Sequence, residues 1–454
     1  MPDFVAVDAY LDTHLDDSIA ELACLCAQPS VAAQNWGLQA CAQMVARMLQ
    51  ARGFTVDIDP TAGAPVVFAE RRGCNRDRTL LFYNHYDVQP AEPLDLWLSP
   101  PFEPTLRDGK LFARGVSDDK GHLTSRLFAI DALLASEVEL PCNVKFVIEG
   151  EEEISSIHLK EYLHQHAQKL AADACIWEFG GVDHREVPMQ YTGLRGICYV
   201  ALSVETASMD VHSGLGGSIF PNAAWRLVWA LNSLKGLDER VRIPGFYDRV
   251  RLPSARDRAL MAALPETAEE YTSRYGLAGF VKGLTGGPEL RIEEVFTPTC
   301  TICGLTAGYQ GPGSKTVLPA QASAKVDFRL VPDQTPERVL TLLRAHLDAE
   351  GFSDVKIDFL GGEPPARTDP DHPFVALVAE AARDVYGRPM QIVPLIGGSG
   401  PNHSFIEALG VPIASAGIGY PGTLAHAPNE NIRLDLYLKG AKHIARILKS
   451  FGSV

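Results

Sequence analysis

The sequence predicts an α/β protein in which a domain with a mostly parallel sheet and helices on both faces is interrupted by an inserted ferredoxin-like α+β domain. Helix-like and strand-like segments alternate from residue 1 to about residue 190, and the alternation resumes near the C-terminus. Between these regions the order is strand, helix, strand, strand, helix, strand. The 454 residues also exceed what one hydrophobic core usually organises, which favours two domains.

The first region begins with helices and continues with strands. Helical periodicity covers Val5–Ala27 and Leu38–Ala51, and the second helix stops at Gly53. The sequence TLRDGKLFARG predicts a hairpin that turns at Asp108 and Gly109. Short apolar runs predict buried strands at Pro65–Ala69, Thr79–Tyr83, Asn143–Ile148 and Ala174–Trp177.

The inserted region runs from about Gly193 to about Gly361 and has the segment order of a ferredoxin-like fold. A helix near Pro373–Tyr386 and a strand at Pro412–Ala416 follow it. We therefore expect residues 1–192 and 362–454 to form one domain and residues 193–361 to be inserted into it. The inserted segments are a strand at Ile197–Glu205, a helix at Ala223–Leu234, a helix-rich insertion, two strands, a helix at Pro336–Ala349 and a strand at Val355–Leu360.

Composition and charge exclude several classes of protein. With 41 basic and 56 acidic residues, the formal charge is −15, and no Lys/Arg-rich run suggests a nucleic-acid or anionic-membrane partner. The acidic N-terminus does not resemble a signal peptide, and no apolar run reaches the roughly 18 residues needed to span a bilayer. The nine cysteines lack the spacing of a disulfide framework. We therefore expect a cytoplasmic protein without nucleic-acid or membrane partners.

The first candidate site residues are His85 and Asp87 in LLFYNHYDVQP, directly after an apolar strand. Open α/β sheets bind their ligands outside the carboxyl ends of strands. An HxD pair suits a metal ligand whose second ring nitrogen is held by a carboxylate. A solvated turn is the alternative for this pair alone.

A second candidate is Asp118 in ARGVSDDKG, where Gly115 and Gly121 allow a tight bend before a helix. A short carboxylate on such a bend can bridge two cations with its two oxygens. Asp119 and Lys120 fit equally well as the start of the helix, because acidic residues favour its first turn.

Further acids and a histidine occupy corresponding positions. Glu151, Glu152 and Glu153 follow the strand NVKFVIEG; such a run is often solvated surface, but at a strand end a cation can bind one carboxylate and leave its neighbour free as a base. Glu178 ends the strand DACIWEFGG, and His426 lies in the loop YPGTLAHAPNE. Together these residues predict a metal centre of oxygen and nitrogen donors at the ends of strands.

Several motifs along nearly the whole chain resemble those of the M20 family of metallopeptidases, with spacing most similar to its carnosine dipeptidase-like branch. The resemblance implies His85 and Glu178 on one metal ion and Glu153 and His426 on the other. It also implies Asp118 as the bridging ligand, Asp87 beside His85 and Glu152 as the catalytic base. The matching motifs are NHYDVQP, ARGVSDDKG, EGEEEISS, YTGLRGICY, DVHSGLGGS, GSKTVLP, FRLVPDQTPE, GGS at 397–399 and AHAPNE.

The resemblance also implies substrate-binding residues and one departure. His212 in DVHSG, Thr316 in KTV, Arg329 in FRLVP and Ser399 coincide with family residues that bind the carbonyl oxygen and the terminal carboxylate. Arginine suits a carboxylate because its planar fork donates two parallel hydrogen bonds, although a surface ion pair is the alternative. Glu178 stands where the dipeptidase branch usually has aspartate, which puts the identity of the substrate in doubt.

The expected function is metal-dependent hydrolysis of dipeptides or short peptides with a free C-terminal carboxylate. A water between two divalent cations would be the nucleophile; zinc suits the ligands, and manganese or cobalt would also fit. An N-acyl amino-acid deacylase of desuccinylase or deacetylase type is the nearest alternative. A metal-binding protein without catalysis, or a Ser or Cys hydrolase, has less support because Glu152 accompanies the five ligands and no G-x-S-x-G motif is present.

The resemblance further implies a homodimer formed through the inserted domain, which would act as a dimerisation and lid domain. In the family, the histidine of the DVHSG motif reaches the cleft of the partner subunit, so His212 would complete the partner's active site. A monomer in which His212 merely packs beside the glycines of GLGG is the alternative.

Overall fold

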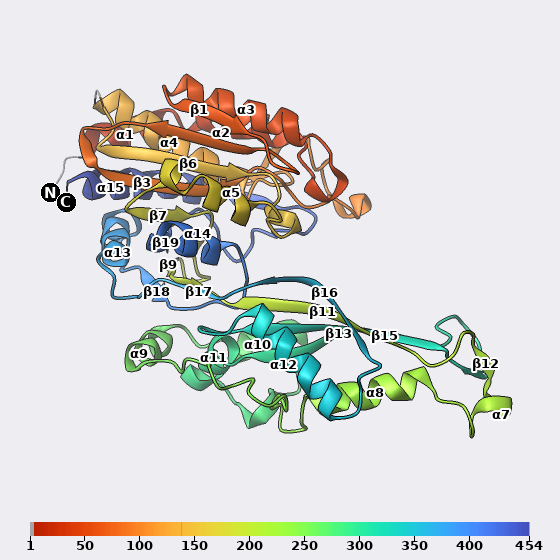
Figure 1. Ribbon diagram of the computed structural model, residues 1–454. Helices are drawn as coiled ribbons and strands as arrows, with labels where there is room; N and C mark the ends of the chain where they lie inside the picture. Colours follow the sequence, from red (N-terminus) through yellow and green to blue (C-terminus); the bar gives the residue numbers. More distant parts are fainter. Residues whose placement is uncertain (1–3, 138, 454) are drawn as a thin grey trace. The chain divides into compact units, whose positions relative to one another are not determined.

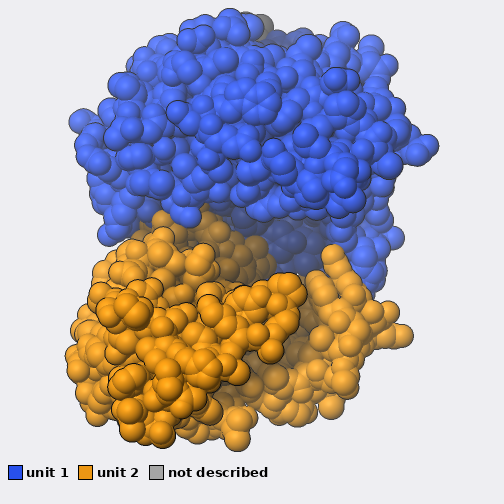
Figure 2. Space-filling model, turned by 90° about the vertical axis from the view of Figure 1, so that its right-hand side faces the viewer, with its two compact units in different colours: residues 1–192, 368–394, 404–454 blue, residues 193–367, 395–403 orange. Residues whose placement is uncertain are grey.

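The computed structural model describes residues 4–137 and 139–453, which form two compact units. Unit 1 comprises residues 1–192, 368–394 and 404–454, and unit 2 comprises residues 193–367 and 395–403 (Figure 2). The second boundary lies beyond the expected residue 361 because β17 (Ala366–Arg367) pairs with β10 (Gly193–Leu194). Residues 395–403 also belong to unit 2, whereas the sequence analysis assigned them to the larger domain.

The main sheet of unit 1 is mostly parallel, which confirms the predicted fold class. Strands β6, β3, β7 and β19 run parallel, and β1 and β2 form an antiparallel edge. The strands lie in the order β1 (Thr55–Asp59), β2 (Val66–Arg71), β6 (Cys142–Glu149), β3 (Asn75–His85), β7 (Ala174–Trp177) and β19 (Ile413–Ser415).

Helices cover both faces of this sheet. Successive residues of β3 point to opposite faces, so each face carries its own hydrophobic core. Leu80 and Phe82 belong to one hydrophobic core, and Leu81 and Tyr83 belong to the other. The second core includes residues of α5 (Leu159–Gln165) and α14 (Asn402–Leu409). The first core includes residues of α1 (Val5–Thr13), α2 (Leu15–Ala27), α3 (Leu38–Ala51), α4 (Lys120–Ser136), α13 (Pro373–Tyr386) and α15 (Leu434–Gly452) (Figure 1).

Smaller elements complete unit 1. The predicted hairpin is present, with left-handed φ angles of 49° at Asp108 and 70° at Gly109. The helix expected over Val5–Ala27 is divided into α1 and α2 at His14. The short helix α6 covers Ala167–Leu170. One small sheet contains β4 (Thr105–Arg107), β5 (Lys110–Phe112) and β20 (Asn431–Arg433). A second small sheet contains β8 (Gly181–Val182), β9 (Pro188–Tyr191) and β18 (Gln391–Val393).

Unit 2 contains the expected ferredoxin-like layer. Its four strands are antiparallel and lie in the order β13 (Thr299–Ala307), β15 (Gln321–Leu330), β11 (Gly196–Glu205), β16 (Lys356–Glu363). The helices α8 (Ala223–Leu234) and α12 (Pro336–Ala349) pack on one face, where alternate strand residues form the core. The helix-rich insertion consists of α9 (Ala255–Ala263), α10 (Ala268–Tyr275) and α11 (Gly287–Phe296).

A projecting arm extends from one end of this layer. It consists of β12 (Val211–His212), which pairs with β14 (Val317–Leu318), and the short helix α7 (Ser213–Gly216). Figure 1 shows β12 and α7 at the end of unit 2 opposite α9 and α11. Among the described residues of both units, no helix combines the length and apolar composition that crossing a membrane requires.

Candidate metal centre and active site

The candidate metal ligands of unit 1 gather where three neighbouring parallel strands end. His85 is the last residue of β3, Glu153 lies in a 3-10 turn (Glu152–Ile154) shortly after β6, and Glu178 directly follows β7. Asp118 lies in the loop before α4, and His426 in the loop between β19 and β20. Parallel strands point their carboxyl ends to the same edge, which brings His85, Glu153 and Glu178 together. The two loops add Asp118 and His426 to this group.

Asp118 lies at the centre of this group. Its Oδ1 is 2.9 Å from Nε2 of His85, and its Oδ2 is 2.9 Å from Nε2 of His426. The same His426 nitrogen is 3.1 Å from Oε2 of Glu153. Ligand atoms of Asp118, Glu153 and His426 all lie within 4.8 Å of one another. The two carboxylate oxygens of Asp118 therefore face two different imidazoles, as a bridging ligand requires.

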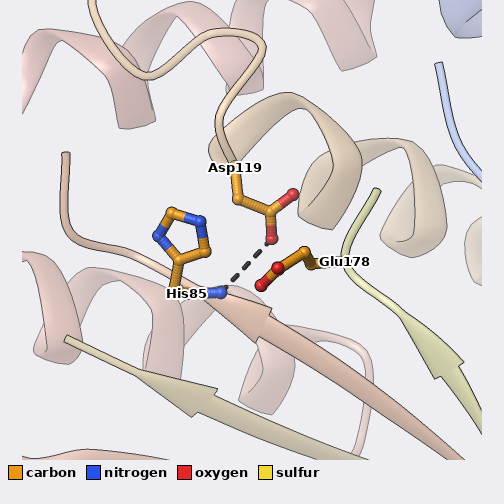
Figure 3. Close-up of side chains that lie close together, drawn as sticks. All are labelled: His85, Asp119 and Glu178. Atoms are coloured by element: carbon orange, nitrogen blue, oxygen red, sulfur yellow. Dashed lines mark hydrogen bonds between the residues drawn. The ribbon is translucent and has the colours of Figure 1, made fainter. Parts of the chain in front are cut away.

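A second group contains His85, Asp119 and Glu178, whose ligand atoms also lie within 4.8 Å of one another (Figure 3). Oε1 of Glu178 accepts a hydrogen bond of 3.1 Å from Trp177 Nε1, but its buried Oε2 has no partner among the described residues. Burial raises the pKa of Glu178 well above its usual value, and the nearby Glu152 raises it further. A buried carboxylate oxygen without a partner is costly, and a cation would satisfy it. The donor set therefore fits divalent metal ions.

Asp87 orients both the histidine and the acidic turn. Nδ1 of His85 is 3.1 Å from the Asp87 carbonyl oxygen and 3.4 Å from its Oδ1. The carboxylate of Asp87 also accepts hydrogen bonds from the backbone N–H groups of Glu152 (3.2 Å) and Glu153 (3.0 Å). A donor bond from Nδ1 leaves Nε2 of His85 as the metal-binding nitrogen. Asp87 thus holds residues from two strand ends in fixed relative positions.

The charges of the site are strongly coupled. Burial alone would raise the pKa of Asp118, but hydrogen bonds from His426 and His85 hold it well below its usual range. Hydrogen bonds to Asp118 and Glu153 raise the pKa of His426 to about 10. Burial raises the pKa of Glu152, His85 lowers it in part and Asp118 raises it, with a net value of about 8. Bound cations would favour the ionised form of Glu152, which a base requires.

From its sequence context, Asp119 is expected only to start the helix after it. The residue does precede α4, but its side chain makes no capping hydrogen bond. Its buried carboxylate instead accepts hydrogen bonds from Asn84 Nδ2 (2.5 Å) and from the backbone N–H of His85 (3.2 Å), the second of which is drawn in Figure 3. Burial raises the pKa of Asp119 to about 7. The pairing of two aspartates in SDDKG was the available signal for this role.

Glu430 is a second residue that the sequence analysis missed. Its Oε1 accepts hydrogen bonds from the backbone N–H groups of Ser117 (2.8 Å) and Asp118 (3.0 Å). Its Oε2 accepts from Arg114 Nη1 (2.8 Å) and the N–H of Gly115 (2.9 Å). One buried carboxylate therefore holds the bend that presents Asp118. Glu430 ends the AHAPNE motif, so its position in that motif was the available signal.

The four candidate substrate-binding residues form two pairs in unit 2. The exposed His212 accepts a hydrogen bond from the backbone N–H of Gly214 (3.0 Å), and its Nε2 is 3.4 Å from Oγ1 of Thr316. Arg329 donates from Nη1 to Oγ of Ser399 (2.9 Å) and from Nε to Oδ2 of Asp327 (3.1 Å). The alternative of a surface ion pair therefore describes only part of the Arg329 environment.

These two pairs are at opposite ends of β15. Thr316 precedes the strand, which begins at Gln321, and Arg329 is its second-to-last residue. At about 3.3 Å per residue, the strand separates the pairs by roughly 26 Å. That distance is several times the length of a dipeptide, so the two pairs of one chain do not form a single pocket for such a substrate.

Comparison with known proteins identifies the family of the chain. The sequence profile of peptidase family M20/M25/M40 matches residues 81–450. The crystal structure of the M20 family metallo-carboxypeptidase Sso-CP2 from Sulfolobus solfataricus is similar, with a TM-score of 0.91 and 36% identity over 96% of this chain and 99% of that chain.

Two enzymes are similar in sequence. The Beta-Ala-His dipeptidase of Rattus norvegicus is 30% identical over 75% of this chain and 72% of its own length. The Cys-Gly metallodipeptidase dug1 of Schizosaccharomyces pombe is 29% identical over 86% of this chain and 83% of its own length. With the profile match covering most of the sequence, the chain belongs to peptidase family M20/M25/M40 and is a metallopeptidase.

Proposed function

We propose that the protein hydrolyses the peptide bond of dipeptides or short peptides that have a free C-terminal carboxylate. The main observation in support is Asp118, whose two oxygens face His85 and His426 next to Glu152. The similar proteins are named as dipeptidases or as a carboxypeptidase. An N-acyl amino-acid deacylase is therefore not favoured.

The metal centre in this proposal holds two divalent cations. His85 and Glu178 would hold one, Glu153 and His426 would hold the other, and Asp118, which lies between the two histidines, would contribute to both. When bound, the cations supply a water of increased acidity and polarise the scissile carbonyl group. Zinc suits these nitrogen and oxygen donors, and manganese or cobalt would also fit.

Glu152 moves the proton in this mechanism. Its carboxylate accepts a proton from the attacking water and returns it to the amine nitrogen of the leaving group. The backbone N–H of Glu152 donates a hydrogen bond to the carboxylate of Asp87, so the base is held next to His85 and Asp118. Asp87 therefore acts as a positioning residue for both the base and the ligand His85.

A substrate screen tests this function directly. Dipeptides, tripeptides, N-acetyl amino acids and N-succinyl amino acids would be compared with zinc, manganese and cobalt in turn. We expect kcat/KM to be highest for a dipeptide or a short peptide. A higher value for N-acyl amino acids, which lack a free amino end, would contradict the proposal and support a deacylase.

Arg329 and Ser399 bind the substrate carboxylate in this proposal. Replacing Arg329 with alanine is expected to lower kcat/KM for free-acid dipeptides roughly 10- to 100-fold, because charge-assisted hydrogen bonds contribute ~1.5–3 kcal/mol. Activity on the corresponding C-terminal amides should change little, and steady-state kinetics on both substrates gives the comparison. The matched control is Arg251→Ala, which removes an exposed ion pair with Asp333 in the same unit. Equal losses on acids and amides would refute this role.

The proposal includes a homodimer in which the partner's arm completes each active site. One chain separates the His212 pair from the Arg329 pair by roughly 26 Å along β15. The outer face of α8 is also apolar and exposed: Trp225 is 58% and Trp229 is 54% exposed, and their rings stack. An exposed apolar helix face beside an open sheet edge suits a two-fold interface between identical subunits.

Subunit mixing tests the shared site. His212→Ala and Glu152→Ala subunits should each be inactive alone, because each lacks one part of every site. After exchange, about a quarter of wild-type activity should return, since half of the dimers are mixed and each has one complete site of two. A mixture of two Glu152→Ala preparations is the control. Exchange confirmed by native mass spectrometry without recovered activity would rule out the shared site.

We also propose a cytoplasmic location. All nine cysteines are free thiols in the structure, which is typical of a reducing compartment. Of the two cysteines on β13, Cys300 is buried and Cys303 is exposed.

A further inference from the structure

We propose that Arg195 is a positioning residue for the substrate carboxylate site, because it ties the Arg329 strand, the end of α11 and the segment of Ser399 together. This inference rests on the proposed role of Arg329 in binding the carboxylate. Arg195 lies in the YTGLRGICY segment, and the proposed chemistry assigns it no task so far.

The side chain of Arg195 connects two elements at one point. It is only 5% exposed, and it donates hydrogen bonds to the carbonyl oxygens of Glu294 (2.7 Å), Thr297 (2.8 Å) and Arg329 (3.4 Å). Glu294 and Thr297 are at the C-terminal end of α11, where helix carbonyls lack partners within the helix. The guanidinium group therefore caps α11 and holds it beside the Arg329 backbone.

The backbone of the same segment holds the other half of the carboxylate site. The N–H of Arg195 donates to the carbonyl oxygen of Ile396 (3.2 Å), and the N–H of Ile396 donates to that of Gly193 (3.1 Å). Ile396 is three residues before Ser399, whose hydroxyl accepts from Arg329. Residues 193–195 are thus hydrogen-bonded to the segment that carries Ser399 and, through the Arg195 side chain, to the backbone of Arg329.

Packing adds a third connection. Leu395, which is fully buried, forms a small core with Ile292, Val295 and Phe296 of α11. Helix α11 therefore contacts the segment of Ser399 through Leu395 and is bonded to the Arg329 strand through Arg195. Loss of the Arg195 side chain would free the end of α11 and loosen the relative position of Arg329 and Ser399.

Arg195 also adds positive charge near the carboxylate site. Burial and, to a lesser extent, the positive charge of the nearby Arg329 together lower its pKa to about 10, so the group remains protonated at neutral pH. Every hydrogen bond that the structure gives its guanidinium goes to a backbone carbonyl oxygen. Its charge therefore adds to that of Arg329 in attracting an anionic group.

The test compares Arg195→Met and Arg195→Lys with wild type, using a free-acid dipeptide and its C-terminal amide. Arg195→Met should raise KM for the acid about tenfold and change kcat by less than about threefold, because it disturbs binding rather than proton transfer. Kinetics on the amide should be unchanged. Arg195→Lys should give a KM rise of about threefold, since an ammonium group keeps the charge but not the planar fork.

The matched control is Arg367→Met. It removes the ion pair with the buried Asp257 of α9 in the same unit, so it should lower the Tm without changing the ratio of acid to amide activity. If Arg195→Met does not fold, the ratio of acid to amide activity in Arg195→Lys decides whether the inference holds. A folded Arg195 variant with a wild-type acid to amide ratio overturns the inference, provided that Arg329→Ala lowers that ratio. An unchanged ratio in Arg329→Ala would instead refute the proposed carboxylate site itself.

Discussion

Replacing Glu152 with glutamine is expected to lower kcat by about 10²–10⁴-fold while both metal ions remain bound. The substitution removes the proton acceptor but is nearly isosteric, and Glu152 is not among the residues proposed to bind the cations. Its backbone bond to Asp87 is retained as well, because that bond uses the N–H of Glu152 rather than its side chain. Steady-state kinetics with elemental analysis of the same preparation gives both quantities.

The neighbouring residue provides the matched control. Glu153→Gln should reduce metal occupancy, because Oε2 of Glu153 lies 3.1 Å from His426 Nε2 in the proposed ligand group. Full metal content in Glu153→Gln together with metal loss in Glu152→Gln would mean that the two roles are reversed.

Replacing Asp118 with asparagine is expected to empty both metal positions and abolish turnover. Asp118 is the residue whose two oxygens face His85 and His426, and an amide offers only one oxygen and no charge. The adjacent Asp119→Asn is the control, and it should weaken metal binding without emptying both positions. Elemental analysis after dialysis at a fixed free metal concentration measures the difference. Loss of both ions in Asp119→Asn, with retention in Asp118→Asn, would identify Asp119 as the bridging ligand.

The helices were the most predictable part of the fold. The predicted bounds Leu38–Ala51, Ala223–Leu234, Pro336–Ala349 and Pro373–Tyr386 are those of α3, α8, α12 and α13. The last two begin with proline at the first helical position, and α13 ends at Gly387 with a left-handed φ of 64°. The break between α1 and α2 was not predictable, because apolar periodicity continues across His14.

The candidate site was predictable where it depends on strand ends. His85, Glu153 and Glu178 each follow an apolar run, and a parallel sheet brings such ends together. Asp119 and Glu430 act through hydrogen bonds to backbone groups of other segments. Such bonds depend on side-chain direction, which apolar periodicity does not reveal.

The assignment of residues 395–403 to unit 2 also lay beyond sequence analysis. It results from the bonds of Ile396 to Gly193 and Arg195 and from the packing of Leu395 on α11. Both are contacts between segments about 100 or more residues apart, in a stretch rich in glycine with no helical or strand periodicity.

Hydrolysis is expected to depend on a two-metal centre around Asp118, and a metal titration of the wild-type protein measures this dependence. Protein stripped by chelation, and shown by elemental analysis to be metal-free, would be assayed on a dipeptide while zinc, manganese or cobalt is added back. We expect no turnover without metal and a rise in activity that levels off at about two equivalents per chain. Full turnover by the metal-free preparation would contradict this expectation.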